Sequence, residues 1–135
     1  MKLNFKWIIV VLMLIGLANC RMSQLQNIEN APVAYQPGEK RTLEQIEKAI
    51  VRGGSSRGWT MAPAGLGHVI GTLHLRSHVA IVDITFDTKT YNIKYKDSTN
   101  LKYRKESDGK EYIHSNYIGW IQNLRTSINR EVLAL

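Results

Sequence analysis

Histidine is the residue type in this chain with the widest chemical scope, because its imidazole can bind a metal or transfer a proton. The four histidines are His68, His74, His78 and His114. His74 and His78 flank Arg76-Ser77, a short connection between two expected strands, and Asp83 follows in the second strand. Nitrogen and carboxylate ligands of this kind build zinc sites. The spacing matches no strong metal motif, and polar residues at a hairpin end explain it as well, so no metal or other cofactor is predicted.

A catalytic serine is the next possibility, since Ser77 stands beside His78. Serine nucleophiles need a base and a third residue that orients it, commonly with small residues around the serine. Neither the small residues nor a third member is evident, and the acidic residues form no pair suited to glycoside chemistry. The chain is therefore predicted not to be an enzyme. The alternative left open is a small periplasmic metal-binding protein or enzyme that uses His74, His78 and Asp83, with His114 as a further candidate.

Cys20 is the only cysteine, and it ends a short apolar segment. Lys2 and Lys6 form a basic start, and the run Trp7–Ala18 is apolar apart from Gly16. This run is too short for a membrane-spanning helix, which needs ~20 residues. It has the length of a signal-peptide core, ~7–15 residues. The pattern predicts export from the cytoplasm.

The stretch Leu17-Ala18-Asn19-Cys20 resembles the lipobox of bacterial lipoproteins, although Asn19 stands where that family prefers Gly, Ala or Ser. The resemblance implies that residues 1–19 are a signal peptide and that Cys20 carries the lipid that binds the membrane. Arg21 at the second mature position implies the outer membrane, facing the periplasm. Two alternatives are an ordinary secretory signal cut near Ala18, which leaves Cys20 a free thiol, and an uncleaved N-terminal anchor.

Length and charge limit what the mature chain can be. Removal of residues 1–19 leaves 116 residues, enough for one domain with a core. It also leaves 16 basic and 11 acidic residues, a net charge of about +5, and no cysteine pair for a disulfide. Such a charge could attract anionic lipid, lipopolysaccharide or acidic glycans, and it could equally serve solubility alone. Nucleic acid is not an expected partner in the periplasm.

Residues 20–41 are predicted to be a lipid-anchored tether, because they are rich in Gln and Asn and contain Pro32, Pro37 and Gly38. Residues 42–135 are predicted to be a single domain. Its first helix begins at Thr42, which forms a capping box with Gln45, and ends at Gly53-Gly54.

Strand-like alternation follows at residues 59–62, 68–76, 78–86 and 91–96, with short connections that predict an antiparallel meander. A small hairpin is expected near residues 101–113, and Ser115 is expected to cap a second helix. That helix carries one apolar stripe, formed by Tyr117, Trp120, Ile121, Leu124 and Ile128. The predicted fold is α+β, a sheet of about four antiparallel strands with both helices on one face. Ile84 and Phe86 should face the helices, and Leu124 should face the sheet.

The other face of the sheet should then be open, polar and net positive. Lys94 and Lys96 alternate with apolar residues, and Arg76 is expected to join them from a strand farther along the sheet. These three residues are the predicted binding surface. Trp59 is a further candidate, because with Trp120 it could line a groove or a small-ligand pocket beside the helices.

Four stretches together resemble a group of small proteobacterial lipoproteins without an established activity. They are Arg57-Gly58-Trp59, residues 77–84, residues 95–101, and Ile113–Tyr117 leading into Trp120. The resemblance implies one compact α+β domain in the cell envelope and no catalytic residues. The leading hypothesis is a non-enzymatic lipoprotein that acts as an interaction module for an envelope protein or an anionic envelope component. A small-ligand carrier is the third alternative.

Overall fold

The computed structural model describes residues 21–35 and 37–135, so the expected signal peptide and Cys20 lie outside the described residues. The described chain forms two helices and two antiparallel sheets, which confirms the α+β class. The elements in chain order are β1 (Met22–Gln24), β2 (Ile28–Pro32), α2 (Leu43–Ser55), β3 (Thr60–Gly65), β4 (His68–Leu75), β5 (His78–Phe86), β6 (Thr90–Thr99), β7 (Arg104–Lys105), β8 (Glu111–His114) and α3 (Ser115–Leu133).

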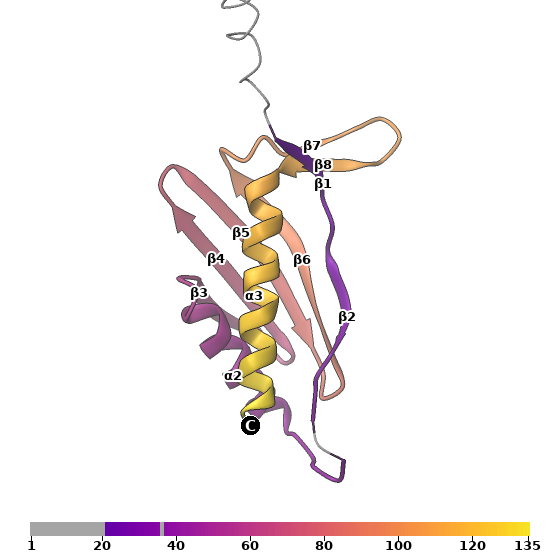
Figure 1. Cartoon of the computed structure of the whole chain (residues 1–135), viewed down its shortest axis with the longest axis vertical. Helices are drawn as coiled ribbons and strands as arrows, with labels where there is room; N and C mark the ends of the chain where they lie inside the picture. Colours follow the sequence, from indigo (N-terminus) through magenta and orange to yellow (C-terminus); the bar gives the residue numbers. More distant parts are fainter. Residues whose placement is uncertain (1–20, 36) are drawn as a thin grey trace, which may run out of the picture.

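The larger sheet has five strands in the order β2-β6-β5-β4-β3. Strands β3 to β6 form the predicted meander, joined by short connections, and β2 adds a fifth strand beside β6 (Figure 1). The smaller sheet, in the order β1-β8-β7, lies at one end of the molecule (Figure 1). The prediction of about four strands therefore matches four of the five strands of the larger sheet and misses the edge strand β2.

The prediction of a tether at residues 20–41 is wrong for residues 22–33, which belong to the folded domain. Met22 pairs with His114 in the small sheet, and Ile28 pairs with Ile93 in the large one. The apolar side chains of this segment are buried, namely Leu25, Ile28, Ala31 and Val33. One of the amides that suggested a spacer, that of Asn27, is a hydrogen-bond partner for backbone. Asn27 Oδ1 accepts from the Tyr95 backbone N–H at 2.9 Å, next to the Ile28–Ile93 pair of β2 and β6.

Helix α2 begins as predicted. The Thr42 hydroxyl accepts from the Gln45 N–H, and the Gln45 side chain accepts from the Thr42 N–H, which completes the capping box. The prediction that Gly53-Gly54 stops the helix is wrong, because α2 continues to Ser55. Both glycines are buried, and a Cβ on either would collide with a neighbouring element. Their small size permits close packing.

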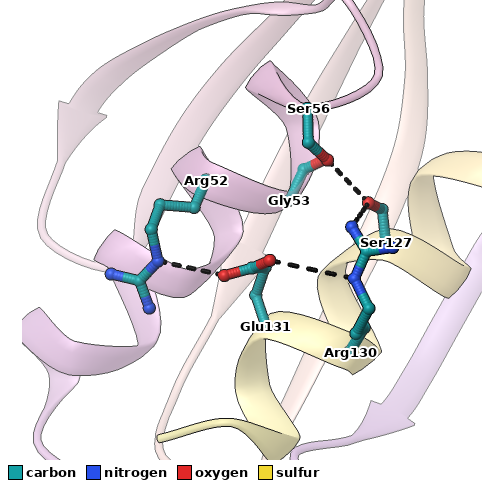
Figure 2. A network of polar contacts seen from close by, with 6 residues as sticks. All are labelled: Arg52, Gly53, Ser56, Ser127, Arg130 and Glu131. Carbon is teal, nitrogen blue, oxygen red and sulfur yellow. Dashed lines mark hydrogen bonds and ion pairs between the residues drawn. The ribbon is translucent and has the colours of Figure 1, made fainter.

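Helices α2 and α3 contact one another through Gly53 and through a set of polar side chains (Figure 2). The Ser56 and Ser127 hydroxyls are hydrogen-bonded at 2.8 Å, and Ser127 is fully buried. Arg52 Nε donates to Glu131 Oε2 at 3.1 Å across the same interface. The serine pair links the two helices, and the buried Ser127 hydroxyl also accepts from Arg130 Nη2 at 3.2 Å.

Both helices pack on the same face of the large sheet. Met61 of β3 contacts Gly54 of α2, while the Tyr95 and Tyr117 rings meet edge to face, 5.8 Å apart, beneath α3. The cross-strand pairs from Met61 through Gly71 and Val82 to Tyr95 place all these side chains on one face. Ile84, Phe86 and Leu124 are buried there, as predicted. No helix among residues 21–35 and 37–135 is long and apolar enough to span a membrane.

Candidate functional site

The predicted histidine group does not assemble. His74 pairs with Val79 and shares the open face of the sheet, whereas His78 lies on the helix side, near Trp120. Asp83 bonds a different histidine, His68, with 2.7 Å between Asp83 Oδ1 and His68 Nε2. Within the part of the chain that the structure describes, no three metal-ligating residues gather. A site built from His74, His78 and Asp83 is therefore wrong, because strand alternation separates the two histidines.

His78 and His114 do approach one another, and their rings stack with centroids 6.4 Å apart. Each ring already has a structural contact. His78 Nδ1 lies 2.7 Å from the Asn100 carbonyl oxygen, and His114 Nδ1 accepts from the Asn116 N–H at the start of α3. His114 therefore caps α3, in place of the predicted Ser115.

Lys94 and Lys96 lie exposed on the open face of the sheet, as their alternation predicts. Lys94 Nζ is 3.3 Å from Glu29, which β2 contributes, and Lys96 Nζ donates to Asp83 at 3.0 Å. Burial opposes ionisation of Asp83, but hydrogen bonds from His68 and Lys96 outweigh it and hold the pKa of this carboxyl below its usual range. The carboxylates of Glu29 and Asp83 thus offset the expected surplus of positive charge. Glu29 had not been expected on this face, because it was assigned to the tether.

Arg76 does not join the two lysines. It lies in the two-residue turn between β4 and β5, in the left-handed conformation with φ 55°. Asp83, the partner of Lys94 in the pairing, is seven residues farther along the chain. At ~3.3 Å per strand residue this places Arg76 about 23 Å from Lys94. The predicted three-residue cationic surface is therefore split into two places.

Apolar side chains interrupt the polar open face. Ile70, Val79 and Ile81 are half-buried, and their cross-strand partners are Asp83, His74 and Thr72. Because both described helices occupy the opposite face, these side chains are covered only by their neighbours in the sheet. The open face therefore combines an apolar centre, near β4 and β5, with ion pairs at its β6 side.

Trp59 and Trp120 line one pocket, as the groove prediction requires. Its other lining residues are Arg57, Leu73 and Asn123, and its volume is about 190 Å³. Sites for drug-sized ligands run from ~300 to 1,000 Å³. This pocket accommodates a small group, such as one ring of a larger partner.

A further pocket, of about 240 Å³, was not predicted from the sequence. It lies at the end of the molecule opposite residue 21, between the segment before α2 and the β5–β6 turn (Figure 1). Its lining residues are Tyr35, Glu39, Lys40, Arg41, Thr88 and Lys89. The adjacent basic residues 40 and 41 were a signal for it, but they had been assigned to a tether.

No protein-family model, curated protein or solved structure matches this chain.

Proposed function

We propose that this protein is a non-enzymatic envelope lipoprotein, anchored to the outer membrane by a lipid on Cys20, that binds another envelope component in the periplasm. The observation that carries this proposal is the open face of the large sheet. It presents Ile70, Val79 and Ile81 beside the Lys94 and Lys96 ion pairs. Apolar residues bordered by polar groups are typical of protein interaction surfaces.

The ion pairs on this face support exchange with a partner. Lys94 and Glu29 are both about half exposed, and such pairs are worth only ~0–1 kcal/mol. A partner that brings its own charges can replace the Lys94–Glu29 contact at little cost. Lys94 and Lys96 would then bind acidic groups of the partner while the isoleucines supply apolar contact.

The start of the fold supports a location close to the membrane. The Arg21 carbonyl accepts a hydrogen bond from the Ser115 N–H at 2.8 Å, and β1 begins at Met22. Consecutive Cα atoms are ~3.8 Å apart, so a lipid on Cys20 leaves almost no spacer before the domain. The small sheet and the N-terminus of α3 would then face the headgroups, and the large sheet would extend away from them.

Site-specific photo-crosslinking of the full chain in bacterial cells tests this proposal. A photoreactive amino acid at Thr72, on the open face, should give a discrete adduct with an envelope component. The same amino acid at Gln122, exposed on α3, is the control and should give none. Lys94→Glu with Lys96→Glu should reduce the Thr72 adduct, whereas Lys105→Glu with Lys110→Glu on the β7–β8 hairpin should not. Equal crosslinking from Thr72 and Gln122 would contradict the assignment of this face.

A further inference from the structure

The pocket at the end opposite residue 21 is rich in positive charge. Lys40, Arg41 and Lys89 line it, against one carboxylate, that of Glu39. Asp87 lies next to this pocket in the β5–β6 turn, where its Oδ1 accepts from the backbone N–H groups of Lys89 and Thr90. That carboxylate is thus engaged in holding the turn.

Arg41 is the unusual member of this pocket, because its side chain is only 9% exposed. Its Nε is buried and has no hydrogen-bond partner in the part of the chain that the structure describes. Among all those residues, it is the only buried side-chain nitrogen or oxygen without one. Buried polar groups are nearly always satisfied, so an unpaired one points to a missing water or ion. On a guanidinium, the missing partner is an acceptor.

Glu39 occupies half of the guanidinium edge that an oxyanion would use. Glu39 Oε2 accepts from Arg41 Nη2 at 2.7 Å, and the neighbouring Nε is left without an acceptor. A carboxylate or phosphate normally takes both positions with two parallel hydrogen bonds. Because the Glu39 side chain is about half exposed, it can swing out and give this edge to a ligand.

We propose that this pocket is an oxyanion-binding site, in which Arg41 binds a carboxylate or phosphate group with Lys40 and Lys89 as flanking charges. A volume of about 240 Å³ suits such a group and leaves the rest of a larger ligand outside. The site adds to the proposed function a second contact, directed away from the anchored end. Anion binding at this pocket requires neither a lipid on Cys20 nor a partner on the open sheet face. This proposal therefore holds even if either part of the proposed function is disproved.

Nuclear magnetic resonance titration of the unlipidated full-length Cys20→Ala chain tests the site directly. Inorganic phosphate and acetate are the two probes, and sodium chloride at matched ionic strength is the control. The Arg41 Nε–H and the Lys89 backbone N–H should shift with saturation in at least one probe and not in chloride. The probe that saturates at lower concentration distinguishes a phosphate ligand from a carboxylate ligand.

Three variants should change the affinity for the anion in different ways. Lys89→Gln should weaken binding about tenfold, as expected for loss of one charged contact. Glu39→Gln should strengthen it, because the competing carboxylate is gone. Lys110→Gln, on the distant β7–β8 hairpin, should leave it unchanged. All three side chains are exposed, so none of these changes should impair folding.

Absence of a saturable shift at Arg41 Nε in both probes would overturn the proposal. So would a Glu39→Gln variant that binds more weakly than the parent chain, since Glu39 would then be part of the site rather than a competitor. Loss of crosslinking at the open face would leave this result untouched, which separates the two proposals.

Discussion

The Ile128 backbone lies 2.8 Å from the position that a Cβ on Gly53 would occupy, so α2 and α3 cross without room for one methyl group. We expect Gly53→Ala to lower the free energy of unfolding by ~1–3 kcal/mol, because the added carbon forces the helices apart. The shift would also strain the hydrogen bond between Ser56 and Ser127. Urea denaturation of parent and variant measures the effect.

Gly119→Ala is the matched control, with the opposite expected sign. Gly119 lies inside α3, and a Cβ there would meet nothing within 4 Å. Alanine is favoured over glycine in a helix interior by ~1 kcal/mol, so this variant should be more stable by up to that amount. Equal effects of the two substitutions would show that the helices do not cross as closely as described.

Leu124 tests how α3 covers the sheet. Its side chain is fully buried, and we expect Leu124→Ala to cost ~2–5 kcal/mol of unfolding free energy. Leu133→Ala serves as the comparison, since Leu133 is 65% exposed on the same helix and should change stability by less than ~0.5 kcal/mol. A loss that small at Leu124 would place the helix elsewhere.

The lowered pKa of Asp83 predicts that the stability of the protein depends on pH. Its folded-state pKa lies below the unfolded value of ~3.9, because hydrogen bonds from His68 and Lys96 outweigh the opposing effect of burial. The stabilisation is therefore present above pH ~4 and is lost as pH falls through the folded-state pKa. Asp83→Asn should be less stable than the parent at pH 7, and the difference should shrink by pH 3.

Chemical denaturation at a series of pH values measures this difference. Glu47→Gln is a suitable control, because Glu47 forms no salt bridge within the described residues. A gap between the parent and Asp83→Asn that stays constant from pH 7 to pH 3 would show that the Asp83 contacts do not stabilise the carboxylate.

Lipidation of Cys20 is a separate prediction that rests on the N-terminal pattern alone. Cells supplied with labelled fatty acid should incorporate it into the parent protein and not into Cys20→Ala. The variant should also accumulate as an unlipidated precursor. Label retained in Cys20→Ala would mean that the lipid lies elsewhere or that the N-terminal segment is an ordinary signal.

The fold was predictable wherever one periodicity dominated. The limits of β5, the cap at Thr42 and the buried stripe of α3 follow from alternation, capping chemistry and helical spacing. Strands β1 and β2 were missed because their Gln, Asn and Pro content is typical of a spacer. The Asn27 amide accepts a hydrogen bond from the neighbouring strand, and the register of β2 shifts between Ile28 and Ala31, which sequence spacing alone does not reveal.

The candidate sites were harder to predict, because they depend on residues distant in sequence. Alternation placed Lys94 and Lys96 on one face, but their acidic partners include Glu29 from a segment taken for a spacer. His74 and His78 stand on either side of a turn, which suggested that they lie close together. Leu75, not His74, is the cross-strand partner of His78, so the two histidines point to opposite faces of the sheet. Arg41 became notable only through its burial, which no local pattern encodes.

The pairing of β1 with β8 also determines when the domain can fold. Met22 and His114 are partners, so the first strand of the fold waits for residues that lie far later in the chain. Helix α2 covers part of the helix-side face, but Tyr91, whose hydroxyl donates to Asn129 of α3, stays uncovered until α3 is complete. Contacts between residues so distant in sequence slow folding. The domain therefore closes late, and we expect a chain truncated before Glu111, which lacks β8 and α3, to remain unfolded.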